Sequence, residues 1–270
     1  MNNTFDFNRF VRLINRQWIG VGKIYLMSLG IIAGIIIGSY AYSIHDITNA
    51  AQYNNLEKLF SFRLLLFAII GLSFISIISS SYFSTLGQKS RAIFDILIPA
   101  STLEKFLSSL FYTVILSTLS YLLLFFIIDL GFVSYVRSNF TSTSTHFSHE
   151  LNKDVIVDNL NYFFLVNWPK NTCWVLFLPF LLNAIFLLGS IAFNNFHFIK
   201  TAIVVVIYST IFVIGLVKIM VWFTKDTIVA NRNMFFSDET NVLKLICVVG
   251  VLVTFLLWGI AYLKLKEKEI

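Results

Sequence analysis

Residues 106–128 read FLSSLFYTVILSTLSYLLLFFII and contain no charged side chain. An α-helix rises about 1.5 Å per residue, so a helix of this length covers the roughly 30 Å hydrocarbon core of a bilayer. In a water-soluble protein, a run as apolar as this would have to be buried on every side. We therefore predict that this segment crosses a membrane as a helix.

Other segments meet the same test of length and apolarity. They are residues 24–44, 64–86, 172–194, 201–222 and 245–263. The composition agrees, because 57% of the 270 residues are hydrophobic and 13% are charged, whereas soluble domains have about 25% charged residues. The prediction is an all-α, polytopic protein with six transmembrane helices in a single transmembrane domain, residues 1–270. A cleaved signal peptide is the alternative for the first segment, but its apolar run exceeds the usual signal core.

The distribution of basic residues predicts the orientation. Lysines and arginines cluster before the first span, between the second and third spans and after the sixth span, and Lys200 lies between the fourth and fifth spans. If these regions lie inside, the whole net charge of +6 falls on the inner side. The positive-inside rule then places both termini in the cytoplasm, in an inner or plasma membrane. This distribution also accounts for the basic pI without a nucleic-acid partner.

The stretch before the first span, residues 5–22, is amphipathic at helical spacing. Its apolar side carries Phe7, Phe10, Val11, Ile14 and Trp18, and its basic side carries Arg9, Arg12 and Arg16. Such a helix is expected to lie flat in the inner leaflet, among membrane lipids. It is either an anchor only or a lever that contacts a cytoplasmic partner.

Three glycines share one face of the first span. Gly30, Gly34 and Gly38 form two overlapping GxxxG steps. Small residues let helix backbones approach closely in lipid, where no hydrophobic force draws helices together. We predict close packing of this face against a helix of the same chain or of a second subunit.

The connection between the second and third spans reads STLGQKSRAIFDILIPASTLEK over residues 84–105. Its central apolar residues have charged neighbours, which predicts a short helix lying on the membrane surface or on a protein partner. An ordinary connection between two helices is the alternative. Ser101 followed by Glu104 is a capping box, which predicts that the third span starts there.

Within this connection, the run Leu97-Ile-Pro-Ala-Ser-Thr-Leu-Glu-Lys-Phe106 resembles the LP-x-S-x-x-E segment of ABC-type-2 transporter permeases. The order of a basic amphipathic helix, six spans and two inner termini is similar as well. In that family, the loop between the second and third spans docks on a separate ATP-binding subunit. The docking residues that the resemblance implies are Gln88, Lys89, Arg91, Ile93, Phe94, Asp95, Pro99, Ser101 and Glu104.

The resemblance implies the membrane subunit of an ABC transporter, most simply an exporter. It implies a homodimer, or a heterodimer with a related permease, with ATP and Mg²⁺ bound on the partner ATPase and no cofactor in this chain. One departure is that residues 223–241 read as a polar outer loop, where exporters of the family have short re-entrant helices.

The sequence lacks the common catalytic motifs. It has no GxxxxGK[ST], no HExxH and no GxSxG, and no metal-ligand set is predicted, so we do not expect an enzyme. An ATP-independent transporter or channel and an accessory protein of envelope assembly remain alternatives. Asp129 is expected at a membrane edge, and no ionisable residue is predicted near the middle of a span, which disfavours a proton relay.

Overall fold

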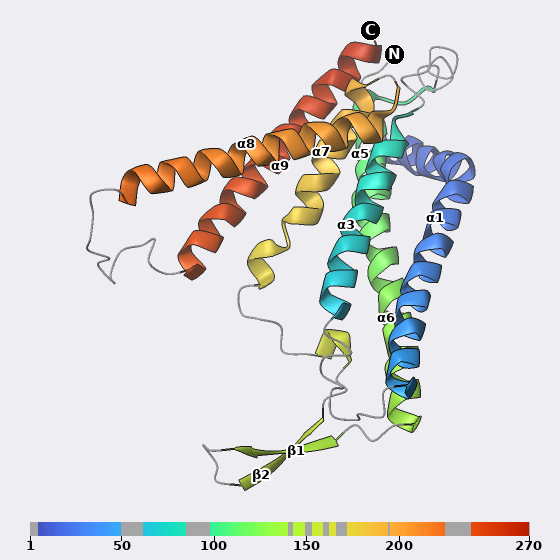
Figure 1. The fold of residues 1–270 in the computed structure, drawn as a ribbon. Helices are drawn as coiled ribbons and strands as arrows, with labels where there is room; N and C mark the ends of the chain where they lie inside the picture. The colour runs from blue at the N-terminus through green and yellow to red at the C-terminus, as the bar shows by residue number, and fades with distance from the viewer. Residues whose placement is uncertain are drawn as a thin grey trace. The chain divides into compact units, whose positions relative to one another are not determined.

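The computed structural model describes residues 5–49, 62–84, 98–139, 143–148, 153–158, 162–165, 172–193, 195–224 and 239–269. The α-helices in this part of the chain are α1 (Phe7–Asn49), α3 (Phe62–Tyr82), α5 (Thr102–Leu110), α6 (Ser117–Asn139), α7 (Leu178–Ala192), α8 (His197–Thr224) and α9 (Glu239–Glu269) (Figure 1). A π-helix, η3 (Phe111–Leu116), joins α5 to α6, and two short 3₁₀ helices are η4 (Phe163–Leu165) and η5 (Thr172–Val175).

Five of the described helices are long and apolar enough to cross a membrane. They span Phe7–His45, Phe62–Tyr82, Thr102–Asn139, His197–Gly215 and Thr240–Lys268. Large apolar side chains are exposed along them, for example Phe212 on α8 and Leu256 on α9, each 66% exposed. Water opposes such exposure and lipid does not. The helices therefore fit a multi-pass membrane protein, as the composition predicted.

The predicted amphipathic stretch and the first span form one continuous helix, α1. No proline or cap separates residues 5–22 from residues 24–44, so the backbone ladder runs on past Lys23. The third span is also longer than predicted. The helical run from Thr102 to Asn139 passes through Asp129, which therefore lies within a helix and not at its end.

The segment predicted as the fourth span, 172–194, has a different structure. Its regular helix, α7, has 15 residues, which is about 22 Å of helix and shorter than the hydrocarbon core. A proline, Pro179, stands in the first turn of α7, where a residue without an N–H is tolerated. The helix starts there, after a turn of 3₁₀ helix, so this segment is not among the five long helices.

A two-stranded antiparallel sheet lies between the third and fourth predicted spans. Strand β1 (Thr143–Ser148) pairs with β2 (Lys153–Asp158), with Thr143 opposite Asp158 and Ser148 opposite Lys153. The other described elements are helical, as predicted.

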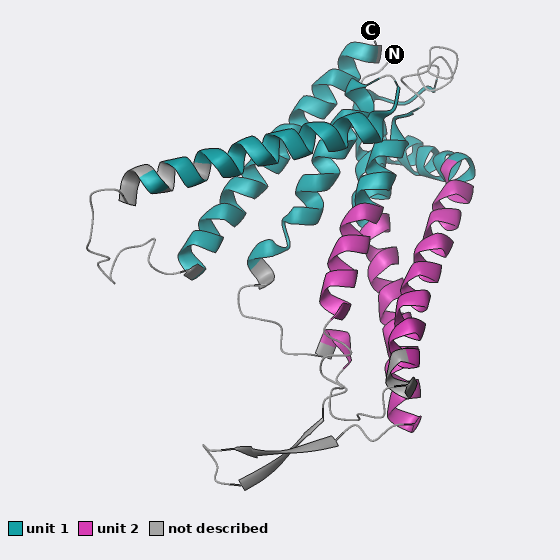
Figure 2. Cartoon of the chain, in the orientation of Figure 1, with its two compact units in different colours: residues 1–20, 75–115, 169–270 teal, residues 21–74, 116–168 magenta. Residues whose placement is uncertain are grey.

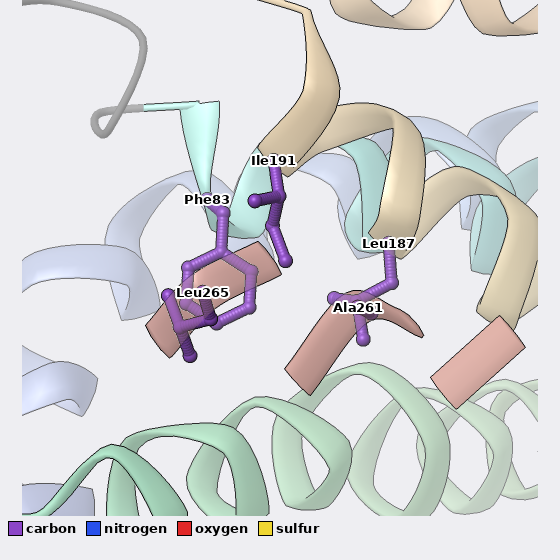
Figure 3. Packing of buried hydrophobic residues seen from close by; sticks show 5 residues of the cluster. All are labelled: Phe83, Leu187, Ile191, Ala261 and Leu265. Carbon is purple, nitrogen blue, oxygen red and sulfur yellow. The ribbon is translucent and has the colours of Figure 1, made fainter. Parts of the chain in front are cut away.

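The contacts divide the chain into two compact units (Figure 2). Unit 1 comprises residues 1–20, 75–115 and 169–270, and unit 2 comprises residues 21–74 and 116–168. In unit 1, helix α7 packs against α8 and α9. The core of this unit gathers Phe83, Leu187, Ile191, Ala261 and Leu265 (Figure 3).

Unit 2 has an aromatic core. Tyr40, Phe74, Tyr121 and Phe125 are buried, and the ring centroids of Phe67 and Phe125 are 5.0 Å apart. A Cβ added at Gly71 would lie 2.6 Å from Cε1 of Tyr121, so this glycine lets α3 and α6 approach closely.

Close contact in unit 1 depends on a glycine too, and this gives a test of the packing of α7 against α8. A Cβ at Gly189 would overlap the side chain of Thr201, whose Cγ2 would be 2.8 Å away. Gly189→Ala should cost about 1–3 kcal/mol through overpacking and lower the thermal unfolding midpoint in detergent by several degrees. The control is Gly259→Ala, where no described atom lies within 4 Å of the added carbon. Equal midpoints for the two variants would contradict the packing.

Candidate functional site

The predicted capping box is present at the start of α5. The backbone N–H of Glu104 donates to Oγ of Ser101 (3.2 Å), and the N–H of Ser101 donates to Oε2 of Glu104 (2.9 Å). Glu104 has no exposed surface, so its carboxylate depends on protein partners. Two otherwise unpaired donors at this helix end are thereby satisfied.

The second oxygen of the same carboxylate contacts the N-terminal helix. Oε1 of Glu104 accepts from the N–H of Asp6 (2.8 Å) and from Nη2 of Arg9 (3.0 Å). Asp6 in turn caps α1, because its Oδ1 accepts from the N–H of Asn8 (2.9 Å). Glu104 therefore joins the start of α1 to the start of α5, and Arg9 pairs with it.

Two tyrosines extend this contact along the N-terminal helix. Tyr112 donates to the carbonyl of Ile14 (2.6 Å) and stacks on Trp18, with ring centroids 6.4 Å apart. The Tyr82 hydroxyl donates to the side-chain oxygen of Gln17. Residues 7–18 are thus bonded to the rest of unit 1 at both ends.

The residues predicted for the interfacial helix have different surroundings. Arg12 and Arg16 are exposed, whereas the Arg9 side chain is 34% exposed and bonds to Glu104. Trp18 is 38% exposed and lies against Tyr112. The position of Arg9 follows from its ion pair with the buried carboxylate of Glu104 and not from the amphipathic pattern.

The predicted docking residues fall into two groups. Those before the helix, Gln88, Lys89, Arg91, Ile93, Phe94 and Asp95, lie outside the described residues. Pro99 is exposed in a bend just before α5, while Ser101 and Glu104 are buried in the cap. Their docking role stays a prediction.

The glycine face of α1 has no close neighbour among the described residues. A Cβ at Gly30, Gly34 or Gly38 would meet no described atom within 4 Å. The predicted close packing of this face is not seen among the described residues, and its packing against a second subunit stays a prediction.

A buried polar cluster around Asn183 was missed by the sequence analysis. Nδ2 of Asn183 donates to Oγ of Ser79 (2.7 Å) and to the carbonyl of Thr113 (3.0 Å). Its Oδ1 accepts from Nε1 of Trp258 (3.3 Å). One amide therefore joins α3, η3, α7 and α9, all within unit 1. The available signal was an amide, Asn183, near the middle of the apolar run of 172–194.

The cluster coincides with the π-helix. In a π-turn the hydrogen bonds run from i to i+5, and such turns are frequent at functional sites. The Thr113 carbonyl lies in this turn and accepts from Asn183. Hydrogen bonds between helices are a main source of attraction in lipid, so the amide positions the four elements around it.

No protein-family model, curated protein or solved structure matches this chain.

The Glu104 junction gives a direct test. Glu104→Ala removes the cap of α5 and the acceptor for Asp6 and Arg9, which should cost about 2–4 kcal/mol because buried donors lose their partner. We expect a lower thermal midpoint and faster protease cleavage within residues 5–20. Glu267→Ala, at an exposed carboxylate, is the control. Unchanged cleavage in Glu104→Ala would show that the junction does not hold the N-terminal helix.

Proposed function

We propose that this chain is the membrane-spanning permease subunit of an ABC transporter, an exporter driven by a separate ATP-binding subunit. ATP and Mg²⁺ bind to that partner, and two permease subunits, identical or related, enclose the transport path. In this proposal residues 172–194, which contain α7, form the fourth of six passes through the membrane. Both termini face the cytoplasm, and the protein lies in the inner or plasma membrane.

The observation that carries the proposal is the bonding of Glu104. The segment that resembles the permease motif ends in a residue that holds both the start of α5 and the start of α1. A displacement of the preceding loop by an ATPase would reach Ser101 within a few residues. The shared carboxylate would pass this displacement to α5 and to the N-terminal helix together. This favours the lever over the simple anchor for the N-terminal helix.

Inside unit 1, the Asn183 cluster extends the same path. Thr113 follows Glu104 along one helical run, and its carbonyl bonds to Asn183 of α7. Trp258 brings α9 to the same amide. A shift of α5 along its axis would therefore be felt by α7 and α9 through hydrogen bonds that cannot be replaced by lipid.

An ATP-independent transporter is the second candidate, and one observation favours it. Arg63, at the start of α3, and Asp129, within the helical run Thr102–Asn139, form a buried ion pair. Charged groups in such surroundings often belong to a substrate or ion path. Purification with or without a bound ATPase separates the two candidates.

The orientation is tested by cysteine labelling. In a background with Cys173 and Cys247 replaced by Ala, a cysteine at Ser144 should react with an impermeant thiol reagent added to intact cells. Cysteines at Ser90 and Glu269 should react only after the membrane is opened, because the positive-inside rule places them inside. Labelling of Ser90 from outside would overturn the orientation and the docking proposal together.

The docking proposal is tested by the double variant Phe94→Ala, Arg91→Ala. Truncating the centre of an interface costs about 2 kcal/mol or more, a loss of affinity of roughly thirtyfold. The variant should insert normally, release an ATP-binding subunit during purification and lose transport-linked ATP hydrolysis. The control is Lys266→Ala, Glu267→Ala, which removes two exposed charged side chains near the end of α9. Retention of the ATPase by the Phe94 variant would reduce the loop to a connection.

A further inference from the structure

The carboxylate of Asp129 has more partners than an ion pair needs. Its Oδ1 accepts from the Tyr40 hydroxyl (2.7 Å) and from Nη1 of Arg63 (3.2 Å). Its Oδ2 accepts from the backbone N–H of Phe163 (2.8 Å). Asp129 is 2% exposed and Arg63 is 6% exposed. One buried carboxylate on α6 thus bonds to α1, α3 and η4, all within unit 2.

The side chains of η4 are packed among rings of the same unit. The Phe163 ring centroid is 5.0 Å from that of Phe125 and 5.1 Å from that of Phe67. Phe164 lies 5.9 Å from Phe126 by the same measure. Phe163 is 6% exposed. A short segment far along the chain is therefore seated on α3 and α6.

The residue before η4 is attached to α6 as well. The Arg137 guanidinium carbon lies 5.2 Å from the centre of the Tyr162 ring, and the Tyr162 hydroxyl is 3.5 Å from Oγ of Ser134. Tyr162 thus contacts α6 at Ser134 and Arg137, and Phe163 contacts the same helix at Asp129. Residues 162–165 cross α6 over more than one turn of that helix.

We propose that residues 162–165 form a strap over the three helices of unit 2, and that the Arg63–Asp129 pair is the latch that holds the strap closed. Arg63 and Tyr40 fix the carboxylate, and its remaining oxygen holds the strap by one backbone hydrogen bond. The rings of Phe163 and Phe164 pack on α3 and α6, and this packing lets the strap return to the same place after it opens. Loss of the hydrogen bond from the Phe163 amide to Asp129 opens the strap at Phe163 while the helices stay together. The inference does not depend on the transporter proposal.

The test is amide hydrogen exchange on the full chain in lipid nanodiscs, read by mass spectrometry with fragmentation to single amides. In the wild type, the Phe163 amide should exchange about tenfold to a hundredfold more slowly than an unstructured amide, since bonds to charged groups are strong. Exchange of the wild-type Phe163 amide at the unstructured rate would overturn the latch without any variant.

The decisive variant exchanges the two charges, Arg63→Asp with Asp129→Arg. It keeps an ion pair between α3 and α6, but an arginine at 129 has no acceptor for the Phe163 N–H. Exchange at Phe163 should rise by about tenfold or more, while amides of α1, α3 and α6 stay within about twofold of wild type. If the charge-exchange variant does not fold, the double variant Arg63→Leu, Asp129→Leu replaces it, because it leaves no buried charge unpaired. The Phe163 amide should exchange faster in this variant by the same factor.

Phe164→Ala is the control, because it removes ring packing and leaves the latch intact. It should change the exchange of the Phe163 amide by less than about threefold. If Phe164→Ala opens the strap and the charge variants do not, ring packing holds the segment and the latch is wrong. Unchanged exchange in a folded charge variant would overturn the inference equally.

Discussion

An apolar solvent offers no hydrogen bonds, so each polar group inside it has to find a partner within the protein. This constraint accounts for three buried polar clusters of the described structure. Glu104, Asn183 and Asp129 each bond to at least three groups, and each joins elements far apart in sequence. In lipid, these contacts hold helices in position where apolar burial alone would not.

Each of the three residues connects a different set of elements. Glu104 joins two helix starts, Asn183 joins four elements of unit 1, and Asp129 joins the elements of unit 2. Breaking such a cluster by removing one member leaves the others buried and unpaired, which is costly. Under the proposed transport function, each cluster would couple the movements of the helices that it joins.

Several elements were predictable because their causes are local. The capping box at Ser101 and Glu104 lies within four residues of chain, and its two hydrogen bonds follow from the spacing. The long helices follow from apolar runs that only lipid or full burial accommodates. The start of α7 has a local signal in Pro179, whereas the hydropathy of residues 172–194 by itself predicts a longer helix. The role of Arg9 was missed because a helical pattern shows which side a residue faces and not which partner waits there.

By itself the sequence determined the class of the protein: long apolar helices, a basic amphipathic start and a capped helix after the second span. These properties depend on solvent preference and on neighbours a few residues away. Only the tertiary structure decided which partners the buried polar residues have. Glu104 bonds to Arg9, 95 residues before it, and Asn183 bonds to Ser79, 104 residues before it. Asp129 lies buried beside Arg63. A polar side chain in a long apolar helix has to be paired, but its partner depends on which helices pack together, and no periodicity in the chain encodes that choice.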